Sequence, residues 1–217
     1  MAAASSNPHD WRVADARFET SAPTLAAAPH PDRPEFAVAG RSNAGKSSLL
    51  NALAGRQGLA RTSAAPGRTQ LLNFFAMALI GGGDRLEVRG ADLPGYGYAA
   101  VPTRIRDGFA PMVEPYLVQR PTLRVLLVLV DARRGPDDRD VAMIEYVAER
   151  PVEVLVVGTK ADKLGASERG LWIKVIADEL GLEHRRVLLT SARTKDGFAG
   201  RGGLVHELAR RLTAEPP

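Results

Sequence analysis

The chain has 217 residues, enough for one well-packed domain with little left for a second. Its 45% hydrophobic and 25% charged residues are typical of a globular protein, and no apolar run approaches the roughly 18–20 residues of a membrane span. The absence of cysteine excludes a disulfide framework, a thiolate zinc site and a cysteine nucleophile, and it favours a cytoplasmic location. The net charge of +4 favours an anionic partner.

Residues 1–33 are predicted to form a flexible N-terminal extension and lead-in, followed by a single domain over residues 34–217. The first fifteen residues are rich in Ala and Ser and lack the basic start and apolar core of a secretory signal. An organelle transit peptide is the alternative, and Asp10 and Asp15 argue against it. The rest of the extension is expected to lead in extended form to a first strand at Glu35–Ala39.

A phosphate-binding loop follows this strand. Gly40–Ser48 fits G-x-x-x-x-G-K-[ST] and runs into a helix predicted at Lys46–Ala54. Its glycines would let backbone N–H groups point at a phosphate, and the helix dipole adds to them. Lys46 would reach the β- and γ-phosphates, and Ser47 would ligate Mg²⁺. The alternative is a Gly-rich turn, which the strand and helix disfavour. The nucleotide contacts expected here are Gly40, Arg41, Ser42, Asn43, Ala44, Gly45, Lys46, Ser47 and Ser48.

The segment from Arg56 to Gln70 has no apolar periodicity, and loops of this length in compact domains are commonly functional. It contains two candidates, Thr62 and Thr69, for a threonine that ligates Mg²⁺ and senses the γ-phosphate. We favour Thr69 because it lies just before the next strand. The nucleotide contacts expected from this loop are Gly67, Arg68 and Thr69.

Two antiparallel strands are predicted at Leu71–Ile80 and Arg85–Gly90, joined by a Gly-rich turn. The second leads into a D-x-x-G sequence. Its aspartate would hold Mg²⁺ through a water, and the N–H of its glycine would bond the γ-phosphate. Out of context, D-x-x-G is more often a simple turn. The expected contacts are Asp92, Leu93, Pro94 and Gly95.

Helices and strands alternate over the remaining chain, which predicts a three-layer α/β/α sandwich with a mostly parallel six-stranded sheet and one antiparallel edge. Buried strands are expected at Val125–Val130, Val152–Val157 and Val187–Leu189. A helix is expected at Thr103–Gln119, which Pro111 and Pro115 could divide, and another from Asp137 onward, with an apolar face of Val141, Ile144 and Val147. A third helix is expected to end at Gly181 and to have an apolar face of Leu171, Trp172, Val175, Ile176 and Leu180. The last helix is expected at Leu204–Leu212.

Two further motifs end strands and indicate guanine as the base. Thr159-Lys160-Ala161-Asp162 resembles N/T-K-x-D, in which the aspartate accepts from N1–H and the N2 amine of guanine, a donor pair that adenine lacks. The stem of Lys160 would lie over the base. Taken alone, this stretch is more simply a solvated turn. Thr190-Ser191-Ala192 resembles the loop whose backbone amide bonds guanine O6.

Together these motifs, with Pro66–Gln70 and Asp92–Tyr98, resemble the EngB (YihA/YsxC) family within the TrmE-Era-EngA-EngB-Septin-like GTPase group. The similarity extends from about Phe18 to the C-terminal helix. It implies a Ras-like fold and a Mg²⁺-dependent GTPase that switches between GTP and GDP, with Lys46, Thr69 and Gly95 as its catalytic residues. It also implies assembly of the large ribosomal subunit, with the subunit precursor and rRNA as partners, and a part in cell division and septation. We also expect a monomer that does not bind membranes.

Two positions make the expected chemistry unusual. Tyr96 follows the D-x-x-G glycine, where Ras-like enzymes often have a water-orienting Gln, so it resembles the hydrophobic-substituted class and predicts slow intrinsic hydrolysis. Asn43 resembles the residue that coordinates K⁺ near the phosphates in cation-dependent GTPases. The alternative is that Asn43 only tolerates a strained backbone.

Other functions stay open from sequence alone. One is an RNA- or ribosome-binding module in which hydrolysis only resets the bound state, and another is a P-loop kinase or ATPase. Basic groups at Arg133-Arg134, His184–Arg186 and Arg210-Arg211 are candidate rRNA contacts, although such clusters are more commonly solvated faces.

Overall fold

The computed structural model describes residues 11–60, 71–96 and 112–214. Its centre is a seven-stranded sheet of order β1-β3-β4-β2-β5-β6-β7. Strands β4, β2, β5, β6 and β7 pair in parallel, whereas β3 pairs antiparallel with both β4 and β1. The three-layer, mostly parallel sandwich with an antiparallel edge is therefore confirmed. The strands are β1 Arg12–Ala22, β2 Glu35–Gly40, β3 Leu72–Gly81, β4 Asp84–Asp92, β5 Leu123–Asp131, β6 Glu153–Thr159 and β7 Val187–Leu189.

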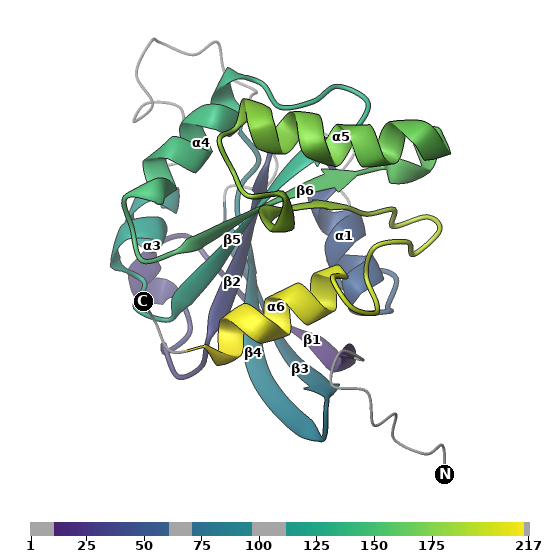
Figure 1. Cartoon of the computed structure of the whole chain (residues 1–217). Helices are drawn as coiled ribbons and strands as arrows, with labels where there is room; N and C mark the ends of the chain where they lie inside the picture. Colours follow the sequence, from purple (N-terminus) through teal and green to yellow (C-terminus); the bar gives the residue numbers. More distant parts are fainter. Residues whose placement is uncertain (1–10, 61–70, 97–111, 215–217) are drawn as a thin grey trace.

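Helices cover both faces of the sheet (Figure 1). One core cluster joins the sheet to α1 and α6 through side chains such as Leu50 and Leu208, and the other joins it to α3, α4 and α5 through Tyr116, Met143 and Ile176. Because the central strands are covered on both sides, they read as continuous apolar runs. The helices are α1 Lys46–Leu53, α3 Val113–Gln119, α4 Asp138–Ala148, α5 Ala166–Glu179 and α6 Leu204–Thr213, with 3₁₀ turns η1 Leu25–Ala27, η2 Ala161–Lys163 and η3 His184–Arg186.

The N-terminal edge of the sheet differs from the sequence prediction. Part of the extension that was expected to be flexible or to lead in extended form is strand β1, which pairs with β3 along its length and adds a seventh strand to the six predicted. Only Ala16 and Ala22 of β1 are buried. The strand therefore has no apolar alternation that sequence reasoning could recognise, and backbone pairing with β3 rather than burial of large side chains defines it.

Helix α5 is present and ends as predicted, but its buried face was predicted partly wrongly. Ile176 is buried and Trp172 packs against the core, whereas Leu171 and Val175 are 62% and 47% exposed. Gly181 has φ 62°, and the N–H of Leu182 bonds the carbonyl of Ala177 at 2.9 Å, which closes the helix in a Schellman motif. On α4, Val141 is only half-buried, while Ile144 and Val147 are buried. Of the helix expected at Thr103–Gln119, the structure shows α3 at Val113–Gln119, and residues 103–111 lie outside the described residues.

A buried ion network lies at the amino ends of the parallel strands. Glu35, the first residue of β2, is fully buried and accepts from Arg89 at 2.8 Å, from Arg120 at 2.6 and 2.9 Å and from the Tyr116 hydroxyl at 2.9 Å. Arg89 also donates to Glu19 of β1 at 2.8 Å. The network therefore ties the edge strand to the centre of the sheet, at the opposite end from the phosphate loop.

Candidate nucleotide-binding site

The sequence-predicted site residues converge on one edge of the sheet. The phosphate loop follows β2, Asp92 ends β4, Thr159 ends β6, and Thr190 follows β7. These strands run in parallel, so their carboxyl ends lie together, where α/β sheets bind ligands. Gly67, Arg68 and Thr69, and the alternative Thr62, lie outside the described residues, and their roles remain predictions.

The phosphate loop curls as its sequence predicts. Gly45 has φ 98°, in the left-handed region, and is the N-cap of α1. Lys46 and Ser47 are therefore the first two residues of the helix, next to its free backbone N–H groups. Asn43 also has a left-handed backbone, with φ 67°. The N–H of Ser42 bonds the Tyr96 carbonyl at 3.2 Å, which fixes the loop against the segment after β4.

The D-x-x-G glycine lies against the phosphate-loop lysine. A Cβ on Gly95 would stand 3.1 Å from Lys46 Nζ and 3.3 Å from Ser42 Oγ, closer than ordinary van der Waals contact, so the lysine would have to shift slightly to make room for it. Glycine therefore favours the close approach of two segments about fifty positions apart in the sequence. This brings Lys46 and Gly95, two of the predicted catalytic residues, together.

Asp92 lies beside them as a buried acceptor. It is 6% exposed, and within the described part of the chain its Oδ1 has no hydrogen-bond partner. Burial raises its pKa to about 6, and the positive charge of Lys46 opposes this shift. A buried carboxylate oxygen without a donor suits a water on a bound cation, so the donor set present here fits the predicted Mg²⁺.

Lys160 connects the base motif to the phosphate loop. Its Nζ donates to the Asn43 carbonyl at 2.9 Å and to Asp131 Oδ2 at 2.8 Å. The Thr159 hydroxyl likewise donates to the Ala44 carbonyl at 2.6 Å. Arg133 and Lys160 together hold the pKa of the Asp131 carboxyl well below its usual range. The T-K-x-D stretch is therefore part of the phosphate-loop structure and is not a solvated turn.

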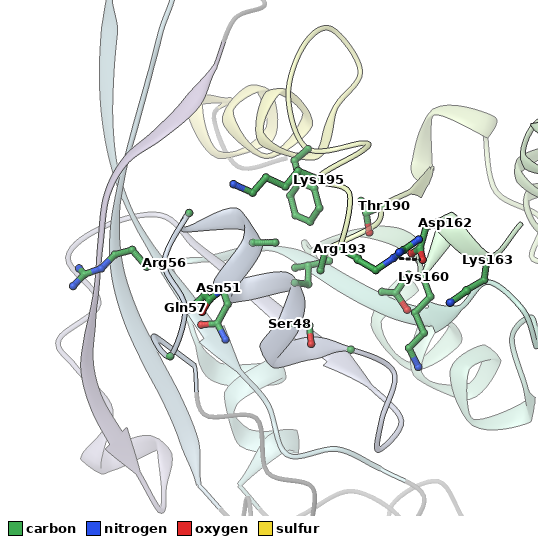
Figure 2. Close-up of a pocket in the computed structure, with 18 residues that line it drawn as sticks. Ser48, Asn51, Arg56, Gln57, Lys160, Asp162, Lys163, Thr190, Arg193 and Lys195 are labelled. Carbon is green, nitrogen blue, oxygen red and sulfur yellow. Dashed lines mark hydrogen bonds and ion pairs between the residues drawn. The ribbon is translucent and has the colours of Figure 1, made fainter.

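Asp162 faces a cavity of about 780 Å³ that lies between α1 and the segment after β7 (Figure 2). Its Oδ1 accepts from Ser191 Oγ at 2.7 Å, and its Oδ2 accepts from Arg193 Nε at 2.8 Å. The hydrogen bond from Ser191, with the guanidinium of Arg193, lowers the pKa of Asp162. The N–H of Ala161 also bonds the Thr190 carbonyl at 3.1 Å. These contacts fix the two predicted base motifs against each other.

Sequence reasoning missed several residues of the site. The Tyr96 hydroxyl donates to Asp140 Oδ1 at 2.7 Å, and Arg41 pairs with Asp137 at 3.1 Å. Asp137 and Asp140 form the capping box of α4. The capping box was readable from the sequence, but its link to the phosphate loop was not. Neither Arg193 nor Asp131 was predicted as a site residue, although Asp131 ends a buried strand.

Several candidate RNA-binding arginines are held by carboxylates. Arg133 pairs with Asp131, and Arg185 pairs with Glu183. Arg211 is buried and pairs with Glu153 at 2.8 Å and with Glu207. Arg211 therefore supports the fold, and the other paired arginines present less net charge than the sequence suggests.

Two general searches of the described residues gave negative results. No group of three His, Cys, Asp or Glu side chains in residues 11–60, 71–96 and 112–214 is placed to hold a metal by itself. None of the helices in those ranges is long and apolar enough to cross a bilayer.

The chain is similar in sequence to known GTP-binding proteins. A family model described as "50S ribosome-binding GTPase" matches residues 35–160. The chain is 45% identical over 186 residues to the probable GTP-binding protein EngB of Geobacter metallireducens, covering 86% of this chain and 88% of that protein. It is 46% identical over 187 residues to the EngB protein of Pelotomaculum thermopropionicum, covering 86% and 91%.

Solved structures show the same fold. A crystal structure of a probable GTP-binding protein EngB aligns with TM-score 0.56 and 22% identity, covering 82% of this chain and 95% of that one. Aquifex aeolicus Era bound to GDP and AlF₄⁻ aligns with TM-score 0.63 and 26% identity over 84% of this chain. The match spans 58% of the Era chain, so Era contains a large part without a counterpart here.

Proposed function

The chain belongs to the EngB family of GTP-binding proteins and hydrolyses GTP, and from this we propose that its four motifs form a single Mg²⁺-dependent guanine-nucleotide site. In this site Gly40–Ser48 holds the phosphates, Asp92–Gly95 senses the γ-phosphate, and Thr159–Asp162 with Thr190–Ala192 holds the base.

The observation that carries the proposal is the convergence of Lys46, Gly95 and Asp92. A Cβ on Gly95 would stand 3.1 Å from the Lys46 ammonium, closer than ordinary van der Waals contact, and the charge of this ammonium acts on the buried Asp92 carboxyl. The Lys46 ammonium, the Gly95 backbone and an Asp92 oxygen that has no donor among the described residues thus lie together near the start of α1. This combination suits a phosphate that carries a divalent cation.

Each residue has a distinct role in phosphoryl transfer, which depends on positioning and charge neutralisation. Lys46 would contact the β- and γ-phosphates, and the Gly95 N–H would bond the γ-phosphate. The hydroxyls of Ser47 and Thr69 would ligate Mg²⁺, with Asp92 accepting from one of its waters. Bound Mg²⁺ neutralises negative charge on the phosphate oxygens.

The hydrolysis step itself is expected to be slow. The Tyr96 hydroxyl is directed to Asp140, so it does not provide the polar group of a water-orienting Gln. Bound K⁺ near Asn43 would supply a fixed positive charge in place of an arginine finger. The left-handed backbone of Asn43 agrees equally with the alternative, in which this residue only tolerates the loop geometry.

We further propose that the GTP form binds a precursor of the large ribosomal subunit through rRNA, as a monomer in the cytoplasm. The description of the matching family as a 50S ribosome-binding GTPase supports this. A link to septation rests on the resemblance to the family alone.

Cosedimentation with large-subunit precursors, in GTP, in GDP and without nucleotide, tests this role. We expect binding in GTP that falls in GDP and is lost in Lys46→Ala. If Lys46→Ala still binds with no dependence on nucleotide, the protein is a ribosome-binding module in which hydrolysis only resets the state. Competition with ATP is a separate control, because effective competition by ATP would favour a kinase or ATPase.

The base assignment has its own test. Asp162→Asn should lose affinity for GDP and gain affinity for xanthosine diphosphate, because xanthine replaces the N2 amine with a carbonyl that an amide N–H can bond. Unchanged GDP affinity in this variant would contradict the guanine site.

A further inference from the structure

The carboxylate assigned to guanine recognition already binds a side chain of its own chain. Arg193 Nε donates to Asp162 Oδ2 at 2.8 Å, and Ser191 Oγ donates to the other oxygen. The Asp162 side chain is only 7% exposed, whereas the Arg193 side chain is 70% exposed. The arginine therefore reaches in from solvent and covers the carboxylate, as Figure 2 shows.

The chemistry of the two possible partners is closely similar. The Watson–Crick edge of guanine presents N1–H and the N2 amine on one carbon, which is a guanidine fragment. Arginine presents the same arrangement of planar N–H donors, with a full positive charge. Both Arg193 and Asp162 line the cavity assigned to the base. The arginine thus offers Asp162 the donors that guanine would offer.

We propose that Arg193 is an internal competitor of guanine, which occupies Asp162 in the nucleotide-free protein and must leave before the base can bind. This inference rests on the proposed guanine site and adds a residue that controls how readily that site fills. Ser191 contacts the opposite oxygen and can stay in place, whereas Arg193 lines the cavity assigned to the base and therefore competes with guanine for the space beside Oδ2.

This arrangement has a kinetic signature. When only a fraction of the free protein has an open site, the apparent dissociation constant rises by the inverse of that fraction. Arg193 acts only on the empty state, so its removal should raise the association rate constant and leave the dissociation rate constant unchanged. Most substitutions at binding sites act instead on dissociation, so the signature is distinctive.

Stopped-flow measurements with a fluorescent GDP analogue on the full chain test the inference. We expect Arg193→Ala to bind about two to five times more tightly, the range expected for loss of an exposed ion pair, with the whole change in association. The gain should shrink at about 1 M salt, where charges are screened beyond about 3 Å. The matched control is Arg201→Ala, which removes the same charge from another exposed arginine between β7 and α6 and should match the wild type.

A double-variant measurement separates this inference from the proposed function. In the Asp162→Asn background, assayed with xanthosine diphosphate, Arg193→Ala should have no effect, because the ion pair is already lost. If Asp162→Asn retains normal GDP affinity, the guanine site itself is wrong. The competitor role alone is overturned if Asp162→Asn behaves as expected but Arg193→Ala leaves the association of GDP unchanged. It is also overturned if Arg193→Ala speeds the dissociation of GDP, as removal of a residue that holds the base would.

Discussion

The Tyr96 hydroxyl donates a hydrogen bond of 2.7 Å to Asp140 Oδ1, and both side chains are buried. Tyr96 directly follows the glycine of D-x-x-G, whereas Asp140 lies in the first turn of α4 and completes its capping box. Burial and the neighbouring Asp140 carboxylate raise the pKa of Tyr96 well above its ordinary value, so the phenol keeps its proton and acts as a donor. The residue that follows the D-x-x-G glycine is therefore fixed to a neighbouring helix.

Removal of this hydroxyl should affect stability more than catalysis. Tyr96→Phe leaves Asp140 short of a donor in a buried position, and we expect the free energy of unfolding to fall by about 1–3 kcal/mol. Intrinsic GTP hydrolysis should stay within about twofold of the wild type. Urea unfolding and single-turnover hydrolysis measure the two quantities. Tyr146→Phe, whose hydroxyl donates to Glu114 at 3.0 Å in a less buried position, is the control. A tenfold loss of hydrolysis in Tyr96→Phe at unchanged stability would place the hydroxyl at the phosphates.

Lys160 should matter for nucleotide affinity beyond the contact with the base that we propose for it. Lys160→Met removes the donors to the Asn43 carbonyl and to Asp131, which join the base motif to the phosphate loop. We expect the dissociation constant for GDP to rise by about tenfold or more, since two lost hydrogen bonds are worth about 1–3 kcal/mol. Lys163→Met, an exposed neighbour that lines the same cavity, should stay within about twofold. Equal effects of the two substitutions would contradict the coupling.

The pKa of Asp92 predicts the pH dependence of the nucleotide-free protein. This pKa is about 6 in the folded state against an ordinary 3.8, so between these values the folded state binds more protons than the unfolded state. The free energy of unfolding should therefore fall as pH rises from about 4 to about 6, by up to about 3 kcal/mol from this group. In EDTA without nucleotide, Asp92→Asn should be more stable than the wild type at pH 8, and the difference should vanish near pH 4. Parallel stability curves for the two proteins would disprove this assignment.

The buried Glu35 network should be structural. Glu35→Gln removes the buried carboxylate that compensates Arg120 and leaves Arg89 only its pairs with Glu19 and Asp32, so we expect about 3–5 kcal/mol of destabilisation by urea unfolding. Glu87→Gln, which breaks an exposed pair with Arg85, should cost less than about 1 kcal/mol. Because Glu35 lies at the opposite end of β2 from the phosphate loop, the GDP affinity of the folded variant should match the wild type. A specific loss of affinity would show a coupling along β2.

The role of Asn43 can be decided by the choice of monovalent cation. If K⁺ binds near the phosphates, GTP hydrolysis should be at least about tenfold faster in KCl than in NaCl at equal ionic strength, and Asn43→Ala should remove the difference. Asn43→Gly is the matched variant, because glycine keeps the left-handed backbone without the side chain. Equal rates in the two salts would leave Asn43 with only its conformational role.

The sequence by itself determined the phosphate loop, the D-x-x-G segment, both base motifs and the buried strands. Each depends on short-range features, such as a glycine between a strand and a helix or a run of apolar residues, which carry their structural meaning locally. The order of these motifs along alternating strands and helices was enough to predict that they meet at one edge of a parallel sheet.

Only the tertiary structure decided the contacts between distant segments. Strand β1 depends on backbone pairing with β3, and its side chains give almost no apolar signal. The same holds for charged groups. From the sequence alone Arg193 could have been an unpaired side chain and Tyr96 a phosphate contact, because a polar residue shows no partner in its own sequence neighbourhood. The partner is set by which strand ends and helix starts the fold brings together, and this places Arg193 on Asp162 and Tyr96 on Asp140.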